Sequence, residues 1–212
     1  MRKIAFFLTF LLLLSAVSCR QKKHDAVYYE QMIDSIRKAE QLGELQRMAG
    51  IGANGDPAKA FFDTLQYHSL PIQSESGDFK KIGKFVKIPR LLNDHLGYSA
   101  SANLSAMALP SAHRYRVLMV SEMQDSITPV LYLFTLSRKY QPIDLLCIYE
   151  QGNEDRKDDF GRTYMDFYVT SNYEITLMQY YLSHTARKPE LFQSRRYIIN
   201  KEGKFEEIPI EL

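Results

Sequence analysis

The chain of 212 residues has no tryptophan, two cysteines, and no apolar run longer than eleven residues. Two cysteines exclude a disulfide-rich scaffold, and short apolar runs exclude a polytopic membrane protein. The chain also lacks a large excess of charge of one sign. The first 18 residues carry Arg2 and Lys3, which leaves 25 basic and 25 acidic side chains in the rest. That balance excludes the basic footprint of a nucleic-acid-binding protein.

The longest apolar stretch is typical of a secretory signal peptide. Arg2 and Lys3 precede the apolar run Ile4–Leu14, and the small residues 15–18 follow it. A membrane-spanning helix needs about 20 apolar residues, so this run is too short to cross a bilayer. A charged start, a short apolar core and small residues at the end predict a cleaved signal over residues 1–18.

The end of this signal, residues 14–19 with the sequence LSAVSC, resembles the lipobox of bacterial lipoproteins. Ala16 stands where leucine is commonest in that family. The resemblance implies cleavage before Cys19, a diacylated thiol, and further acylation of the new amino group, for example with palmitate. It also implies a location in the bacterial cell envelope. By the same analogy, Arg20 and the lack of an acidic run after Cys19 favour the periplasmic face of the outer membrane. The alternative is an ordinary cleaved signal followed by a chance cysteine.

Residues 19–24 then form the lipidated cysteine and a short basic tether, which reaches about 17 Å when extended. The Lys and Arg of this tether can contact anionic head groups. With Cys19 lipidated, Cys147 has no cysteine to pair with, so no intrachain disulfide is expected. We expect Cys147 to be a buried, inert thiol in a strand.

Residues 25–212 are predicted to form one α+β domain, helical over 25–67 and rich in β-strands over 83–208. Apolar positions at helical spacing predict an amphipathic helix over residues 25–48. Asp56 followed by Pro57 is a helix-start signal, and it predicts a second helix that runs to residue 67.

The later part of the chain predicts an antiparallel meander sheet of six to eight strands, because apolar stretches alternate with short polar links. A closed or half-closed β-barrel is the alternative. The strand over 130–138 is apolar on both faces, so we expect it to be central and covered on both sides. The expected strands lie at 84–88, 102–108, 114–122, 130–138, 143–150, 163–170, 174–182, 195–200 and 204–208.

The sequence contains partial matches to motifs for cofactor or metal binding, but the residues around them do not fit such sites. The glycine pattern of residues 50–55 lacks the preceding strand that a dinucleotide site requires. The acids of residues 153–159 are interrupted by Arg156 and Lys157, unlike a calcium loop. The five histidines have no zinc spacing, and no nucleophile motif is present. We therefore predict no catalytic residue, no cofactor, no metal site and no enzymatic activity.

Aromatic side chains suggest where a partner binds. A cluster of tyrosines lies on the two expected strands at 163–182, and we take Tyr164, Tyr168 and Tyr181 as the candidate binding face. Half-exposed tyrosines are suited to protein or sugar contacts. The alternative is ordinary strand composition and core.

Three triplets of Asp, Ser or Thr, and an apolar residue are centred on Ser35, Thr64 and Ser126. They resemble the acceptor site for O-glycosylation in some exported proteins of anaerobic bacteria, and average composition gives about one such triplet by chance.

Together these features predict a membrane-anchored envelope lipoprotein that acts as a non-enzymatic protein-interaction module of the accessory, inhibitor or immunity type. The expected partners are the membrane, through the lipid on Cys19, and another envelope protein. One alternative is a lipoprotein that binds a small ligand or a glycan in a pocket of the sheet. A hydrolase of envelope polymers is a further alternative, although it has no motif to support it.

Overall fold

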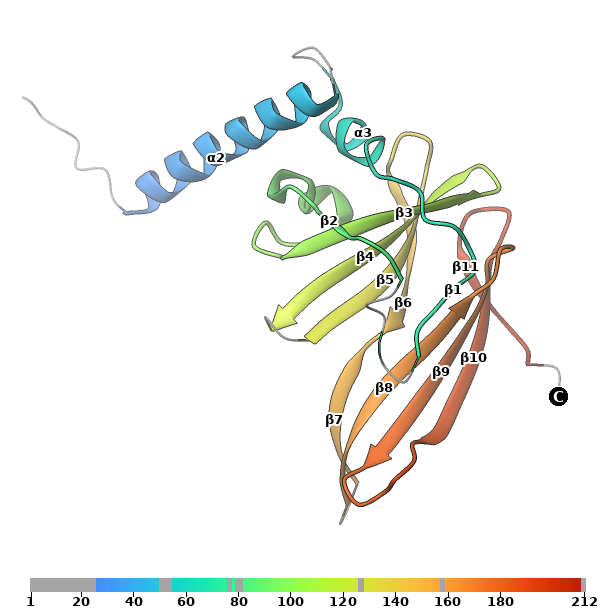
Figure 1. Ribbon diagram of the computed structural model, residues 1–212. Helices are drawn as coiled ribbons and strands as arrows, with labels where there is room; N and C mark the ends of the chain where they lie inside the picture. Colours follow the sequence, from blue (N-terminus) through green and yellow to red (C-terminus); the bar gives the residue numbers. More distant parts are fainter. Residues whose placement is uncertain are drawn as a thin grey trace, which may run out of the picture. The chain divides into compact units, whose positions relative to one another are not determined.

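Figure 1 shows the computed structural model, which describes residues 26–49, 55–75, 78, 82–125, 128–156 and 159–210. The chain divides into two compact units, Met1–Ala39 and Glu40–Leu212. The signal segment, Cys19 and the tether lie outside the described residues, as do residues 50–54 and Ser126.

Helix α2 (Ala26–Ala49) is a continuous helix of 24 residues. Tyr29, Met32, Ile33 and Ile36 recur at spacings of three and four residues, so they lie along one stripe of the helix. Among the residues that the structure describes, no helix is long and apolar enough to cross a membrane.

Helix α3 (Pro57–Phe62) begins where Asp56 caps it. The Ala58 N–H donates to the Asp56 carboxylate at 2.9 Å, and Pro57 occupies the first helical position, where no N–H is needed. The helix ends at Phe62, five residues earlier than the sequence predicts. Two single turns of 3-10 helix, η1 (Arg90–Leu92) and η2 (Asp94–Leu96), follow between strands.

Within the described residues, eleven strands form two antiparallel sheets. Sheet A has the order β2-β3-β4-β5-β6, and sheet B has the order β1-β8-β9-β10-β11, with β7 also paired to β8. The strands of sheet A are β2 (Val86–Lys87), β3 (Leu104–Ala112), β4 (Tyr115–Asp125), β5 (Thr128–Leu136) and β6 (Pro142–Tyr149). The strands of sheet B are β1 (Ile72–Gln73), β7 (Gln151–Arg156), β8 (Asp159–Val169), β9 (Glu174–Ser183), β10 (Glu190–Ile199) and β11 (Phe205–Ile208).

Two segments join the sheets. Strand β6 runs through Glu150 directly into β7, and the Met165 N–H donates to the Glu150 carbonyl at 3.1 Å where the chain leaves sheet A for sheet B. The second is the strap, residues 67–75 and 82–88. It starts with a bridge from Tyr67 to Ala108 of β3, pairs as β1 with the end of β8, and returns as β2 to β3.

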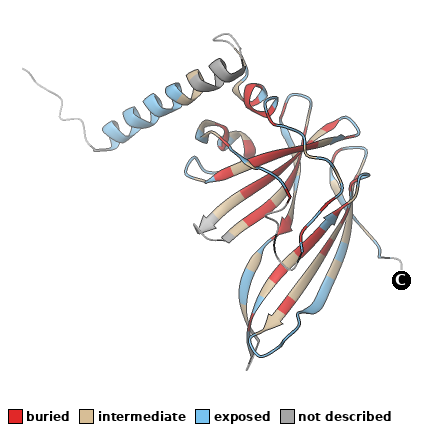
Figure 2. Cartoon of the chain, in the orientation of Figure 1, coloured by how far each residue is buried: buried red, intermediate tan, exposed pale blue. Residues whose placement is uncertain are grey.

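Sheet A is covered on both faces. One face packs against sheet B in a core that includes Leu131 and Leu133, and the other packs under α3 and the 3-10 turns with Phe134 and Leu136. Figure 2 shows the buried residues concentrated in the strands of sheet A and in the part of sheet B near it. The prediction that the strand near residue 130 is covered on both sides is therefore confirmed.

The fold is mostly antiparallel β-sheet with few helices. Consecutive strands do pair as a meander, but the single sheet of six to eight strands was not the right arrangement, because the run β6–β7 passes from one sheet to the other and divides the strands between two sheets. Within the described residues neither sheet closes on itself, so the closed-barrel alternative is wrong.

Candidate functional site

The inner face of sheet B changes from apolar to polar along its length. Alternate residues of β8, β9 and β10 line up across the three strands in rows, because the pairing is antiparallel and in register. Sheet B extends past sheet A (Figure 1). From the core outward, the rows are Val169–Ile175–Tyr197, Phe167–Leu177–Arg195, Met165–Gln179–Gln193 and Thr163–Tyr181–Glu190.

A groove of about 260 Å³ opens at the level of Gln179, between β6 and the inner face of sheet B. Gln179 and Gln193 lie directly opposite each other on β9 and β10. In the part of the chain that the structure describes, neither side-chain amide has a hydrogen-bond partner. The groove is lined by Leu146, Cys147, Glu150, Met165, Leu177, Gln179, Gln193, Arg195 and Tyr197.

Cys147, in the wall of this groove, is not set up as a nucleophile. Its half-buried thiol donates to the Tyr149 carbonyl at 3.8 Å. Burial, followed by the nearby charge of Glu150, raises the pKa of Cys147 to about 11, although the bond to Tyr149 opposes this. The thiol therefore stays protonated at neutral pH, and the thiolate is the reactive form.

Beside the groove, the outer edge of β10 has no strand paired to it within the described residues. Strand β11 pairs with β10 only from Arg196 to Ile199, and after Ile208 the chain runs away from β10 (Figure 1). Pro209, the next residue, has no N–H to continue the ladder. No described strand pairs with this side of Glu190–Arg195, which we call the free edge.

The direction of the backbone groups on the free edge follows from the hairpin. The Asn200 N–H donates to the Lys204 carbonyl at 2.9 Å, so Asn200 points its peptide groups toward β11. Peptide groups alternate along a strand, and Arg196 and Ser194 therefore point the same way. Because β11 ends opposite Arg196, the N–H and C=O of Ser194 face outward, and no described strand pairs with them.

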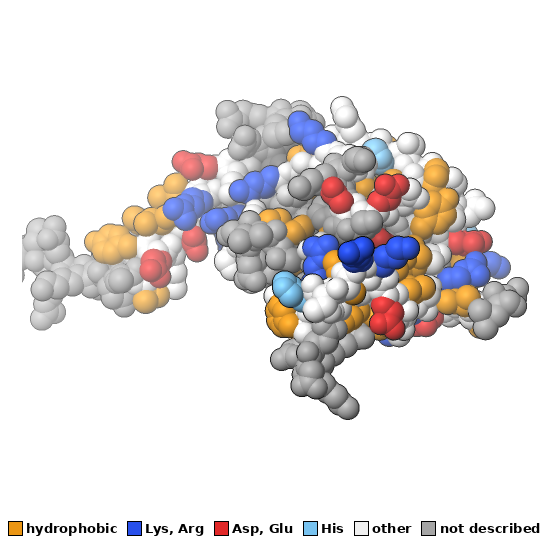
Figure 3. Space-filling model, turned by 60° about the horizontal axis from the view of Figure 1, so that its bottom comes forward, with side chains coloured by type: hydrophobic (Ala, Val, Ile, Leu, Met, Phe, Trp, Pro, Cys, Tyr) orange, Lys and Arg blue, Asp and Glu red, His pale blue; other side chains and the backbone are white. Residues whose placement is uncertain are grey.

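Apolar side chains are exposed along the free edge. Leu191 is 51% exposed and Phe192 is 40% exposed. The register of β10 against β9 shifts between Leu191 and Gln193, so Phe192 is the extra residue of a β-bulge. Figure 3 turns the lower end of the molecule forward and shows apolar side chains among basic and acidic ones there. Proteins usually avoid apolar side chains on an unpaired edge, so this segment is suited to receive another strand.

The three predicted tyrosines do not form one face. Tyr164 and Tyr168 are on the outer face of β8, whereas Tyr181 pairs with Thr163 and lies on the inner face of β9. Tyr164 and Tyr181 are each only 4% exposed, and Tyr164 stacks on Tyr180 with ring centroids 5.3 Å apart. Only Tyr168, 37% exposed, is open to a partner.

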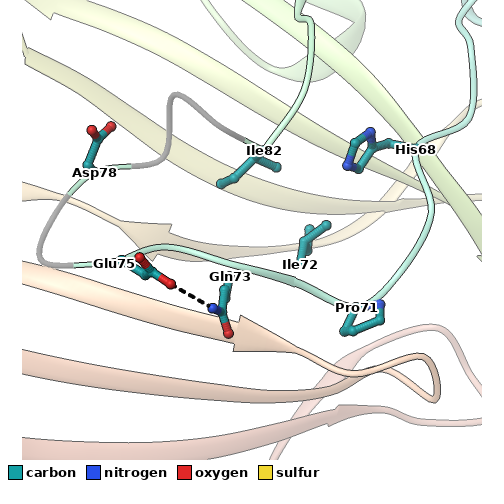
Figure 4. Close-up of a pocket in the computed structure, with 7 residues that line it drawn as sticks. All are labelled: His68, Pro71, Ile72, Gln73, Glu75, Asp78 and Ile82. Atoms are coloured by element: carbon teal, nitrogen blue, oxygen red, sulfur yellow. Dashed lines mark hydrogen bonds between the residues drawn. The ribbon is translucent and has the colours of Figure 1, made fainter.

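A second pocket, of about 340 Å³, lies against the strap and is shown in Figure 4. Its polar groups are the carboxylates of Glu75 and Asp78, the amide of Gln73 and the imidazole of His68. The Gln73 amide donates to Glu75 at 3.1 Å. Both carboxylates belong to exposed residues, so water screens their attraction for a cation.

The most connected charged group is Asp63, which follows α3. It accepts a hydrogen bond from the Tyr140 hydroxyl and forms ion pairs with Arg116 at 3.1 Å and Lys59 at 3.4 Å. The Arg116 guanidinium also lies 4.4 Å from the centre of the Tyr140 ring. Burial by itself raises the pKa of Asp63, but Tyr140, Arg116 and Lys59 together lower it below its ordinary value of 3.8. This cluster joins α3 to sheet A.

The remaining predicted residues are placed as follows. Ser35 lies in α2 and donates to the Met32 carbonyl at 2.8 Å, and Thr64 donates to the Phe61 carbonyl at 2.6 Å. Ser126 lies outside the described residues. Within the described ranges, no group of three or more His, Cys, Asp or Glu side chains is arranged to hold a metal ion.

No model of a protein family, no curated protein and no solved structure matches this chain. The free edge was missed in the sequence because the strand was expected to begin at residue 195. Glu190–Ser194 contains a bulge, which breaks the alternation of apolar and polar residues. The one available signal was the pair of adjacent apolar residues, Leu191 and Phe192, beside charged ones.

Proposed function

We propose that this chain is a lipoprotein of the bacterial envelope that binds another polypeptide and catalyses no reaction. The observation that carries the proposal is the free edge, where the outward peptide groups of Ser194 lie beside the exposed side chains of Leu191 and Phe192. An extended segment of a partner can add there as a further strand of sheet B. Main-chain hydrogen bonds then supply affinity, and side chains on the two faces supply specificity.

The second part of the proposal is a lipid anchor on Cys19. The lipobox-like residues before Cys19 support acylation of that thiol, and two or three acyl chains hold a protein firmly on a bilayer, at about 0.8 kcal/mol for each buried CH₂. We place the protein on the periplasmic face of the outer membrane, on the analogy with lipoproteins that lack an acidic run after the cysteine.

Two substitutions of one residue test the edge. Ser194→Pro removes the outward N–H and blocks a neighbouring strand, at a position where proline is tolerated because that N–H is not used by β9. Ser194→Ala keeps the backbone and removes only the hydroxyl. The full-length tagged protein is captured from its native envelope after mild cross-linking, and partners are identified by mass spectrometry.

We expect the wild type and Ser194→Ala to capture a stoichiometric polypeptide partner. The amount of partner captured by Ser194→Pro should be at least about fivefold lower. Equal thermal unfolding of the two variants confirms that the fold is intact. Equal capture by both variants would show that the free edge is not the binding surface.

A second candidate function, binding of a small polar ligand or a glycan, is favoured by one observation. The amides of Gln179 and Gln193 face into the groove without partners among the described residues. Such amides are suited to hydroxyl or peptide groups of a ligand. A ligand of this kind should raise the unfolding temperature of the wild type, and Gln179→Leu with Gln193→Leu should abolish the shift.

A further inference from the structure

The bulge at Phe192 decides which charged side chains of the free edge share a face. Glu190 pairs with Tyr181 of β9, and Arg195 pairs with Leu177. Tyr181 and Leu177 are four residues apart on β9, so both lie on its inner face. In a regular strand, residues 190 and 195 would point to opposite faces. The extra residue, Phe192, shifts the alternation of side chains by one position. The side chains of Glu190 and Arg195 therefore both lie on the inner face of sheet B.

This spacing makes the free edge complementary to itself. When two copies of Glu190–Arg195 pair antiparallel about a two-fold axis between Phe192 and Gln193, Glu190 of each copy lies opposite Arg195 of the other. Leu191 lies opposite Ser194, whose outward peptide groups are available for the new ladder. The axis then passes through the bulge of each strand, so Phe192 of each copy lies opposite Gln193 of the other.

The charges on this edge are available for such a pairing. Glu190 has neither an ion pair nor a hydrogen bond among the residues that the structure describes. Arg195 is exposed, and the neighbouring Tyr197 and Glu207 raise the pKa of its guanidinium. Opposite charges placed directly across two strands attract, and the two-fold axis forms this contact twice.

We infer that the occupant of the free edge is a second copy of this chain, paired antiparallel through Glu190–Arg195 so that sheet B continues across the two copies. The inference rests on the proposed function, because it names the partner of the same edge. Charge complementarity argues for a second copy, since each side supplies both the acid and the base that the other requires.

The size of this contact sets where the dimer forms. Six paired residues bury less than the 1,200 Å² or so of a standard interface, so free chains should associate weakly. Two chains held on one membrane meet at a much higher effective concentration. We therefore expect the dimer on the membrane, and the test uses the full-length anchored protein.

Charge exchange tests the pairing. Two copies of the full-length chain with different tags are expressed together, cross-linked in the native envelope, and captured by one tag. Arg195→Glu places an acid opposite an acid in both contacts, and Glu190→Arg places a base opposite a base. When both tagged copies carry the same variant, we expect co-capture to fall at least about fivefold. The reason is that like charges directly opposite each other repel.

The decisive sample mixes the two variants. A copy with Arg195→Glu carries acids at both positions, and a copy with Glu190→Arg carries bases at both, so the mixed pair has two attractive contacts. We expect this mixture to recover co-capture close to that of the wild type. Lys201→Glu and Glu202→Arg, which reverse charges in the exposed β10–β11 turn, are the matched controls and should leave co-capture unchanged.

The results separate this inference from the proposed function. Wild-type copies that are not co-captured, or mixed variants that do not recover, overturn the second copy as occupant. Loss of a different polypeptide partner by Ser194→Pro in the same envelope would keep the free edge as a binding surface. If Ser194→Pro changes neither result, both proposals fail.

Discussion

At the scale of single residues, Asp63 shows how one carboxylate can hold an element to a sheet. It is reached by Lys59 of α3, by Arg116 of β4 and by Tyr140 of the turn before β6. Phe62 stacks on the Tyr140 ring with centroids 5.7 Å apart, so the polar contacts adjoin an apolar one. The position of α3 against sheet A therefore depends on both kinds of contact.

The charge of Asp63 gives this contact a pH dependence. Since the folded state lowers the pKa of Asp63, its contribution to stability is complete above about pH 4 and is lost as pH falls through the folded pKa. We expect Asp63→Asn to lower the free energy of unfolding by about 1 kcal/mol at pH 7, because the contacts are partly exposed. At pH 2.5 the difference should shrink. Urea unfolding at both pH values measures this, and an equal difference at both would contradict it.

Gly161 is a second position where a single residue determines the packing, because Tyr181 packs over it. A Cβ added at Gly161 would lie 2.5 Å from Cζ of Tyr181 and 2.6 Å from the Leu182 carbonyl oxygen. We expect Gly161→Ala to lower the free energy of unfolding by about 2 kcal/mol, since the backbone oxygen cannot move aside. Gly152→Ala on β7 is the control, because its Cβ meets only the Thr163 hydroxyl at 3.3 Å. Equal thermal stability of the two variants would show that Tyr181 is not locked in place.

At the scale of elements, the sequence predicts strands where alternation is regular and misses them where it is not. Strands β4, β5 and β9 lie close to their predicted positions, because apolar residues repeat there. Strand β7 was missed because Gln151–Arg156 contains no aliphatic or aromatic side chain, and it exists through pairing with β8. The candidate face of tyrosines depended on the register between β8 and β9, which pairs Tyr181 with Thr163 and which no single strand reveals.

Strand β5 gives the sharpest test of an element. Its two faces pack into different cores, with Leu131 toward sheet B and Phe134 toward α3. We expect Leu131→Ala and Phe134→Ala each to lower the free energy of unfolding by about 3 kcal/mol, because each leaves a cavity in a filled core. Leu145→Ala on the neighbouring strand is the exposed control and should change it by less than about 0.5 kcal/mol. A small effect of either buried change in denaturant titration would mean that one face is loosely packed.

At the scale of the whole molecule, the proposed lipid on Cys19 would place the free edge at a membrane surface. Outside residues 1–18 the basic and acidic side chains balance at 25 each, so the net charge of that part supplies no attraction to an anionic bilayer. We expect Cys19→Ser to move the protein from the membrane fraction to the soluble fraction and to abolish labelling by a palmitate analogue. Immunoblots of fractionated cells check the first effect. Persistence of Cys19→Ser in washed membranes would contradict lipid anchoring at this residue.

The strap has a consequence for the order in which the chain folds. Every other pairing between the described strands joins neighbours in sequence, so those contacts close short loops and form early. Strand β1 must instead wait for β8, because Ile72 pairs with Val169. During synthesis the strap emerges well before its partner, and we expect β1 to be the last strand secured. The core beside the strap therefore stays incomplete until β8 has been made, and arrest of synthesis before β8 leaves that side of the core open to water.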